Sequence, residues 1–382
     1  GAANTSGTRV YFNIINDVSN PTIYNKDIVF TIKSPEGHFP DTDVTLSCYA
    51  GIIQPKANSY IVSPGGAPIL IPVSRANDSD LGSQLGASES FSASLVWTDN
   101  VNKIASNSNL SLVYVVGTGT SGYLIVKPGN AQGNAVVAVK NTSNKILWSW
   151  HIWVTNYTPT PLGTGKFMDR NLGALGNTAN TVDAKGLLYQ WGRKDPFPGS
   201  TTVNDVVEPT LYTVSSTTSI TKTSVAAANN LANAIANPAT FYTGIDPNKD
   251  WYTNNTTANA GKNDGLWGVS SKTIYDPCPM GWRIPPNGIW GSTAFDVGTN
   301  STTLGTNGIV WDGYGNWYPA AGYRNDTSGN LTNVGLHGLY WSGTAQVFNM
   351  YATYLRFTSA TITPAGITFR AGGFSIRCVS EQ

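Results

Sequence analysis

The residues best suited to binding chemistry lie late in the chain, in two aromatic segments rich in oxygen and nitrogen groups. Sugars have apolar C–H faces that aromatic rings can cover, and hydroxyls that amide, carboxylate and guanidinium groups can hydrogen-bond. The same composition also builds loop-rich cores, in which Trp and Tyr anchor long loops. As a group, the candidate ligand-binding residues are Trp311, Asp312, Tyr314, Trp317, Tyr318, Tyr323, Arg324 and Asn325.

A search for catalytic residues finds no complete set. The sequence has no G-x-S-x-G elbow, H-E-x-x-H pair, C-x-x-C pair or Walker lysine. His38, His151 and His337 are scattered without metal-ligand spacing. Carboxylates for sugar cleavage would have to come from polar loops, where a solvated or turn-capping role is the ordinary one. These candidates are Asp264, Asp296 and Asp312, and we predict that the protein is not an enzyme.

Calcium is the alternative use of the oxygen-rich loops. No acidic loop of the EF-hand type is present, so the sequence predicts neither a metal site nor a cofactor and leaves calcium as an open alternative. The side chains that calcium would use are Asn263, Asp264, Asp312, Asn325 and Asp326.

A glycine-rich segment, Gly117–Gly122, matches the dinucleotide-binding pattern G-x-G-x-x-G. That motif requires a helix after the glycines, so that the helix N-terminus meets the pyrophosphate. Here Tyr123–Val126 has the residue types of another strand. The segment is therefore predicted to be a hairpin turn.

Composition limits the classes of protein to consider. A chain of 382 residues suggests two domains, and 12% charged residues with a net charge of +1 give no attraction to nucleic acid. No apolar stretch is long enough to span a membrane. We expect export, with a signal peptide or lipid-anchor cysteine removed before Gly1. At most one disulfide can form among Cys48, Cys278 and Cys378, and their spacing does not choose the pair.

The N-terminal region, residues 1–157, is predicted to be all β, with an immunoglobulin-like or pilin-like sandwich. Whether residues 1–50 form a separate lobe is left open. In the segment 146–154, Trp148 and Trp150 alternate with His151 and Trp153. This indicates a strand covered on both faces, and the alternative is a strand that offers one face to a ligand. The other expected strands are 10–14, 28–32, 44–49, 60–62, 69–73, 91–97, 112–116, 123–126 and 135–139.

The C-terminal region, residues 160–382, follows a Pro-rich segment at 159–163 and is predicted to be α+β. Leu231, Ala234 and Ile235 have helical spacing, which predicts one helix within 224–237. Short strands are expected at 340–342, 354–357 and 374–378.

Several ordered blocks of this region suggest a family. The set resembles the Fibrobacter succinogenes major paralogous domain, which is common in surface proteins of Bacteroidetes. Segments 57–65 and 148–153 are similar to what precedes that domain. The blocks are Lys166–Ala174, Gly186–Phe197, Tyr275–Pro285, Tyr340–Ser342 and Gly373–Val379.

The resemblance implies a C-type-lectin-like fold for residues 160–382, related in outline to the sulfatase-modifying-factor fold. It also implies a disulfide between Cys278 and Cys378, which leaves Cys48 free. Ligands would bind the loops between blocks, near 200–222, 240–268, 290–335 and 343–352.

The function that this resemblance implies is that of an exported adhesin or lipoprotein at the cell surface or outer membrane, including a fimbrial tip subunit. Its lectin-like domain would bind glycan or protein on a host or microbial surface. The N-terminal region would dock to fimbrial subunits by strand addition. The alternatives are a structural envelope protein without a small ligand and an enzyme that acts on polysaccharide.

Overall fold

The computed structural model describes residues 25–32, 42–49, 51–163, 165–291, 304–305, 307–311 and 316–381. Strands make up 36% of the structure and helices 6%, so the fold is mainly β, as the sequence predicted. The chain divides into two compact units, residues 1–53 and 54–382. The sequence-based boundary at 157–160 lies inside the second unit. The expected strand at 10–14 and His38 lie outside the described residues.

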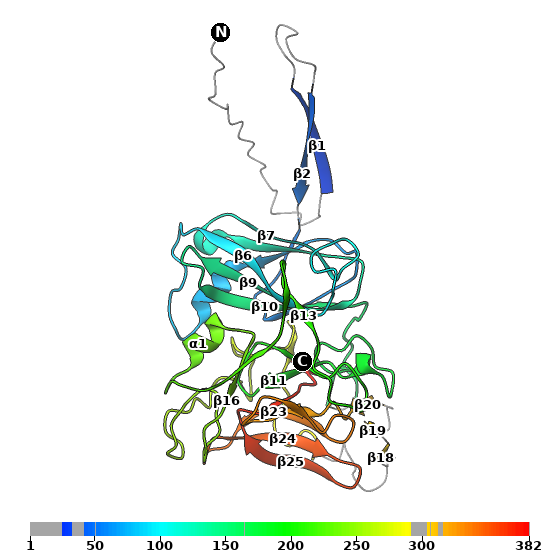
Figure 1. Ribbon diagram of the computed structural model, residues 1–382, viewed down its shortest axis with the longest axis vertical. Coiled ribbons are helices and arrows are strands. Elements are labelled where there is room, and N and C mark those ends of the chain that lie inside the picture. Colours follow the sequence, from blue (N-terminus) through cyan, green and yellow to red (C-terminus); the bar gives the residue numbers. More distant parts are fainter. Residues whose placement is uncertain are drawn as a thin grey trace. The chain divides into compact units, whose positions relative to one another are not determined.

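The first unit contains a two-stranded antiparallel ribbon (Figure 1). Its strands are β1 (Asn25–Ile32) and β2 (Thr42–Tyr49), and a short strand, β3 (Ile52–Ile53), follows. Asn25 lies opposite Tyr49, and Ile32 lies opposite Thr42. The lobe that the sequence left open is thus a compact unit in the structure, residues 1–53.

The second unit begins with two sheets made by residues 59–154. In one, β6, β9, β10 and β4 are successive neighbours; in the other, β5, β8 and β7 are. β4 runs parallel to β10, and the other pairs are antiparallel. The elements are β4 (Ser59–Val62), β5 (Ile69–Pro72), η1 (Val73–Asp78), β6 (Phe91–Thr98), β7 (Leu110–Val116), η2 (Gly119–Ser121), β8 (Tyr123–Pro128), β9 (Gly133–Asn141) and β10 (Ile146–Val154).

Two expectations about this region are confirmed. Trp148, Trp150 and Trp153 of β10 are all buried, which means that both faces of the strand are covered. The glycine-rich segment is the turn between antiparallel β7 and β8, with Val116 opposite Tyr123. Only the three-residue η2 lies there, so no helix N-terminus is available for a pyrophosphate.

Residues 160–381 contain many short strands and one short α-helix among those described. The elements are η3 (Val182–Ala184), β11 (Leu187–Gln190), β12 (Phe197–Pro198), β13 (Leu211–Tyr212), β14 (Thr217–Thr218), β15 (Thr221–Ser224), α1 (Leu231–Ala236), β16 (Thr240–Thr243), β17 (Trp282–Arg283), β18 (Leu304–Gly305), β19 (Gly308–Trp311), β20 (Asn316–Pro319), β21 (Tyr323–Arg324), β22 (Leu331–Thr332), β23 (Gly338–Ala345), β24 (Tyr351–Phe357), β25 (Ile362–Phe369), β26 (Gly373–Ser375) and β27 (Val379–Ser380).

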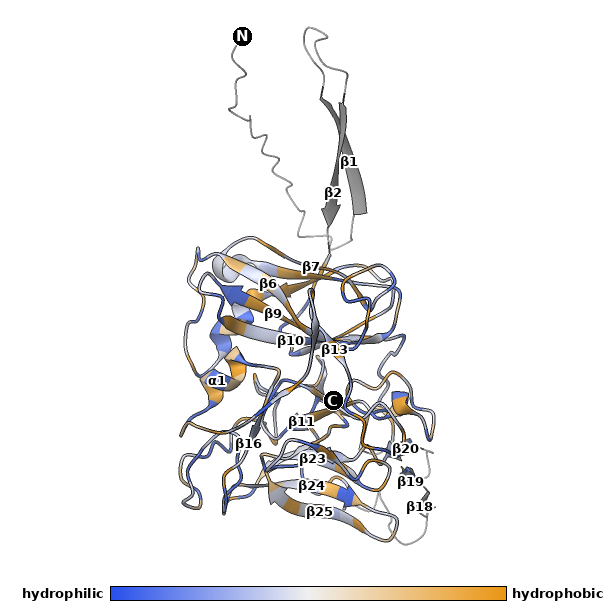
Figure 2. Cartoon of the chain, in the orientation of Figure 1, coloured by the Kyte–Doolittle hydropathy of each residue, from blue (hydrophilic) through white to orange (hydrophobic). Residues whose placement is uncertain are grey.

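The principal sheet of this region has eight strands, in the order β12-β11-β26-β23-β24-β25, with β21 and β22 attached at β26. β23, β24 and β25 lie side by side (Figure 1). Along the last part of β24, buried Leu355 and Phe357 alternate with half-buried Tyr354 and Arg356, and this strand carries both hydrophobic and hydrophilic colours in Figure 2. Because alternate residues of a strand point to opposite faces, one set packs into the core and the other lines the opposite face.

The hairpin of β13 and β14 pairs with β6 and therefore extends the β6-β9-β10-β4 sheet, not the eight-stranded one. Tyr212 of β13 lies opposite Thr98 of β6, and Leu211 is buried. The sequence did not predict this exchange, because pairing between distant segments leaves no local pattern. Residues on both sides of the predicted boundary at 157–160 therefore share a sheet.

The helix is shorter than expected. It begins at Leu231 rather than at residue 224, because Thr221–Ser224 forms a parallel strand pair with Thr240–Thr243. Leu231, Ala234 and Ile235 are its buried residues, so the helical spacing identified its buried face correctly. None of the described helices is long and apolar enough to cross a membrane.

Candidate ligand-binding site

A hollow of about 300 Å³ lies on the eight-stranded sheet, beside the β21–β22 hairpin. Strands β23, β24, β25 and β26 supply most of its lining, and β21 with the turn after it, His337 and Gly372 supply the rest. Its residues are Tyr323, Asn325, Asp326 and His337, together with Leu339, Tyr354, Arg356, Thr368, Phe369, Gly372 and Phe374.

The floor of the pocket is aromatic. Phe374 stacks on the buried Trp341, with ring centroids 4.1 Å apart, and its ring lies 5.5 Å from that of Tyr354. Tyr323 meets Phe374 edge-on at 5.9 Å. A Cβ at Gly372 would lie 2.9 Å from the Phe374 ring, so the close approach of this ring requires glycine there. These contacts fix the rings in place and leave a rigid apolar surface.

Polar groups surround this floor. Oδ1 of Asn325 accepts hydrogen bonds from the backbone N–H groups of Thr327 and Ser328, both at 3.0 Å, and so shapes the turn. Nδ2 of Asn325 has no partner among the described residues. The Tyr323 hydroxyl accepts a bond from Asn333 at 3.3 Å and keeps its own proton for another acceptor. The pocket thus offers hydrogen-bond donors that the fold does not use.

Burial also sets the protonation of two pocket side chains. It raises the pKa of Tyr354, so the phenol keeps its proton and can donate it in a hydrogen bond. Burial lowers the pKa of His337, and the nearby Arg356 lowers it further. His337 is therefore neutral at pH 7, and its ring stacks on Tyr323 with centroids 6.3 Å apart.

The structure separates the predicted ligand residues into three groups. Tyr323 and Asn325 line the pocket. Trp317 is half-buried on β20, where its carbonyl accepts a hydrogen bond from Arg377. The remaining residues are buried or not described.

Tyr318 and Arg324 are buried, and internal contacts occupy them. The guanidinium of Arg377 lies 3.8 Å from the centre of the Tyr318 ring. Arg324 donates to Pro198 O at 2.7 Å and pairs with both carboxylate oxygens of Glu208. We assign Tyr318 and Arg324 to the support of the site. Only the backbone of Trp311, in β19, is described, and Asp312 and Tyr314 lie outside the described residues.

Sequence reasoning missed most of the lining, including His337, Leu339, Tyr354, Arg356 and Phe374. It placed the ligand in the loops, whereas these residues lie on or next to strands. The alternation in Tyr354-Leu355-Arg356-Phe357 indicated which of these residues share a face, with Tyr354 and Arg356 on one side. It did not indicate that Phe374 and Tyr323 would lie beside them.

Of the three carboxylates considered for sugar cleavage, the structure describes Asp264, which has local partners. Asp264 pairs with Lys262 at 3.0 Å and also bonds to Arg370. Asp296 and Asp312 lie outside the described residues. In the part of the chain that the structure describes, no group of three or more His, Cys, Asp or Glu side chains gathers to hold a metal ion.

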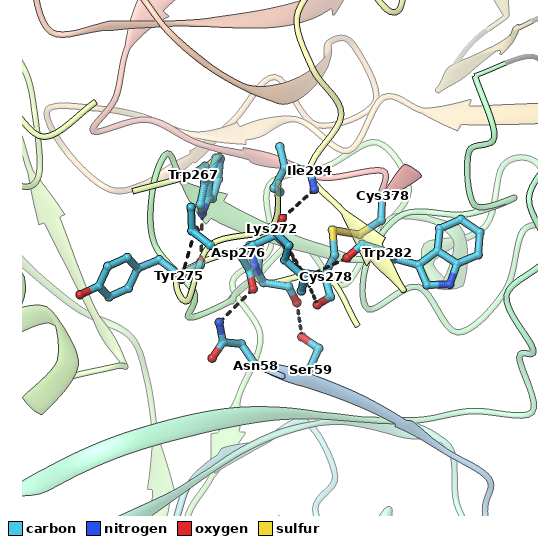
Figure 3. Close-up of polar contacts among 12 residues, drawn as sticks. Asn58, Ser59, Trp267, Lys272, Tyr275, Asp276, Cys278, Trp282, Ile284 and Cys378 are labelled. Carbon is cyan, nitrogen blue, oxygen red and sulfur yellow. Dashed lines mark hydrogen bonds and ion pairs between the residues drawn. A yellow bond between two sulfur atoms is a disulfide. The ribbon is translucent and has the colours of Figure 1, made fainter. Parts of the chain in front are cut away.

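The disulfide joins Cys278 to Cys378, the pair that the resemblance implied (Figure 3). Asp276 organises the loop before it. Its Oδ1 accepts from Cys278 N at 2.8 Å and from Lys272 Nζ at 2.7 Å, and its Oδ2 accepts from Ile284 N at 2.9 Å. A carboxylate with three donors around it is a rigid anchor for this irregular backbone.

Two residues from the N-terminal side of the chain, Asn58 and Ser59, also hydrogen-bond this loop (Figure 3). Asn58 Nδ2 donates to the carbonyls of Ile274 and Asp276, at 2.7 and 2.9 Å. Ser59 Oγ donates to Pro277 O at 2.6 Å. Trp148 Nε1 in turn donates to Asn58 Oδ1 at 3.2 Å. Two upstream blocks of the sequence therefore support the disulfide loop, and we assign this cluster a structural role.

Comparisons with protein-family models, with curated proteins and with solved structures found no match for this chain. The family resemblance of the sequence blocks therefore stays a prediction. What the pocket does has to be argued from its own side chains.

Proposed function

We propose that this protein is an exported surface adhesin of the C-type-lectin-like kind, and that it binds glycan in the pocket of the eight-stranded sheet. The observation that carries the proposal is the meeting of rigid aromatic rings with unused hydrogen-bond donors in one hollow of about 300 Å³. This volume is at the lower end of the range for small-ligand pockets, roughly 300–1,000 Å³.

The chemistry of the lining supports a sugar over a wholly apolar ligand. The half-buried rings of Tyr323 and Tyr354 give surfaces against which the C–H face of a sugar can pack, and the nearly buried Phe374 holds them in place. Asn325 Nδ2 and the hydroxyls of Tyr354 and Thr368 can bond sugar hydroxyls around the edge. An apolar ligand would leave these partly buried polar groups unsatisfied, which is unfavourable.

The ordered sequence blocks support the surface location and the adhesin role, because the family that they resemble is one of surface proteins. Residues 1–53 form their own compact unit. In this proposal they connect the binding segment to the cell surface or, by strand addition, to fimbrial subunits.

A glycan array probed with the full chain tests the proposal. Tyr354→Ala removes one ring of the pocket and should lower the affinity for the bound glycan at least tenfold. Tyr114→Ala is the matched control, because Tyr114 is 56% exposed on β7, in a different sheet, and should leave binding unchanged. Thermal unfolding of both variants verifies that they are folded.

A blank array with the folded parent chain would rule out glycan as the ligand. It would favour a protein receptor or a structural role in the envelope. Equal binding by Tyr354→Ala and by the parent would move the glycan site away from this pocket.

A further inference from the structure

Arg356 differs from the other arginines of the described chain in having no hydrogen bond or ion pair there. Its guanidinium lines the pocket, half-buried, on β24 between Leu339 and Thr363 of the neighbouring strands. Each of the others donates to a protein oxygen: Arg75, Arg170, Arg193, Arg283, Arg324, Arg370 and Arg377. Among the arginines that the structure describes, the one without such a partner is the one in the hollow.

The charge balance of the pocket leaves Arg356 uncompensated. The carboxylate in the lining is Asp326, and its Oδ2 lies 3.6 Å from Lys249 Nζ. Lys249 also lies 3.3 Å from Asp246, whose side chain is 77% exposed and therefore well hydrated. His337, with its lowered pKa, adds no charge at neutral pH. A positive charge therefore remains beside the aromatic floor.

We propose that the pocket takes an acidic saccharide and that Arg356 binds its carboxylate. This inference rests on the proposed glycan-binding function and specifies the ligand's chemical class. A guanidinium presents parallel N–H donors that match the two oxygens of a carboxylate. With the carboxylate paired there, the sugar ring packs against Tyr354, and Asn325 donates to its hydroxyls. A single uncompensated cation suits a monoanion such as a uronic acid or a nonulosonic acid.

The test compares acidic oligosaccharides with neutral counterparts of the same linkage, using the full chain. The probes end in glucuronic acid or glucose, in galacturonic acid or galactose, and in N-acetylneuraminic acid, with a sulfated galactose as a further anion. The parent chain should bind at least one carboxylate probe at least tenfold more tightly than its neutral or sulfated counterpart. The uronic and neuraminic arms then show which acid is preferred.

Variants of Arg356 separate charge from geometry. Arg356→Gln removes the charge and should weaken binding of the acidic probe at least tenfold, while Arg356→Lys keeps the charge and should restore only part of it. Arg283→Gln is the matched control, because Arg283 bonds a backbone carbonyl outside the pocket. Thermal unfolding establishes that each variant is folded.

The outcomes distinguish this inference from the function on which it rests. Binding of neutral and acidic probes alike, sensitive to Tyr354→Ala but not to Arg356→Gln, would overturn the acidic ligand and leave the glycan site standing. Equal binding of sulfated and carboxylate probes would show recognition of charge alone and would overturn the carboxylate assignment. Failure of every probe to bind would remove both proposals.

Discussion

Asn134 hydrogen-bonds two titratable side chains, the solvent-exposed Asp99 and the fully buried His151. It donates to Asp99 Oδ2 from its backbone N–H, at 2.8 Å, and from Nδ2, at 3.3 Å. Its Oδ1 lies 2.9 Å from His151 Nε2. Burial lowers the pKa of His151 to about 3, whereas the bonds from Asn134 favour the charged form of Asp99.

This shift makes stability depend on pH. The folded pKa of His151 lies below its ordinary value of 6.5, so its contribution to the free energy of unfolding grows as pH rises from about 3 to 6.5.

We predict that His151→Gln removes this dependence. Between about pH 4 and 6.5 the free energy of unfolding of the parent should rise with pH relative to the variant, by up to about 1.4 kcal/mol per pH unit. Urea unfolding at several pH values measures the difference. Asp205→Asn changes an exposed carboxylate and should follow the parent. Parallel curves for His151→Gln and the parent would contradict the prediction.

Two arginines of the eight-stranded sheet should respond differently to truncation. Arg324 is fully buried and donates to Pro198 O and to Glu208. Arg324→Ala should therefore lower the free energy of unfolding by roughly 3 kcal/mol or more. Arg356 has no such partners in the described chain, and Arg356→Ala should cost less than about 1 kcal/mol. Denaturant unfolding tests both, and a large loss for Arg356→Ala would indicate a structural role instead of a ligand-binding one.

Strands and turns with a local cause were predictable, and those that depend on distant pairing were not. The alternation of Trp148 and Trp150 with His151 and Trp153 correctly indicated a strand covered on both faces. Helical spacing identified the buried face of α1, but its start at Leu231 depends on the pairing of β15 with β16. Register between strands far apart in the chain has no local signature.

The pocket shows the same limit. Tyr323 and Asn325 were named because their neighbourhood is rich in rings and amides. Tyr354 and Arg356 share a face by simple alternation, but only the order β26-β23-β24 brings them beside Phe374. Composition thus identified Tyr323 and Asn325 of the pocket, and the topology of the sheet determines which other residues lie beside them.

The β13–β14 hairpin gives a prediction for a single element. Leu211 is 1% exposed and packs into the core where the hairpin joins β6. Leu211→Ala should lower the free energy of unfolding by roughly 2–5 kcal/mol, because it removes buried methyl groups and leaves a cavity. Leu336→Ala is the control, since Leu336 is 62% exposed. Equal urea midpoints for the two variants would mean that the hairpin is not part of the cooperative core.

At the scale of the whole molecule, residues 54–382 form one compact unit, and its main hydrophobic cluster includes buried residues from both sides of position 160. Polar contacts cross the predicted boundary at 157–160 in several places. Trp153 Nε1 donates to Ala174 O at 3.1 Å, and Lys194 Nζ donates to Ser149 O at 3.0 Å. The bonds from Asn58 and Ser59 to the disulfide loop cross it too. A cut there would expose apolar surface and leave buried polar groups unpaired on both sides.

We therefore predict that residues 160–382 alone do not reach the native fold, whereas residues 54–382 do. The longer fragment should unfold in a single urea transition followed alike by tryptophan fluorescence and by near-ultraviolet circular dichroism. The shorter one should retain secondary structure but lose the near-ultraviolet signal of its packed tryptophans and bind a hydrophobic dye. A cooperative transition with native near-ultraviolet dichroism for residues 160–382 would show that the C-terminal region folds independently. In that case the contacts made by Asn58, Ser59 and Trp153 would only dock two finished domains, and glycan binding could be studied on the shorter fragment.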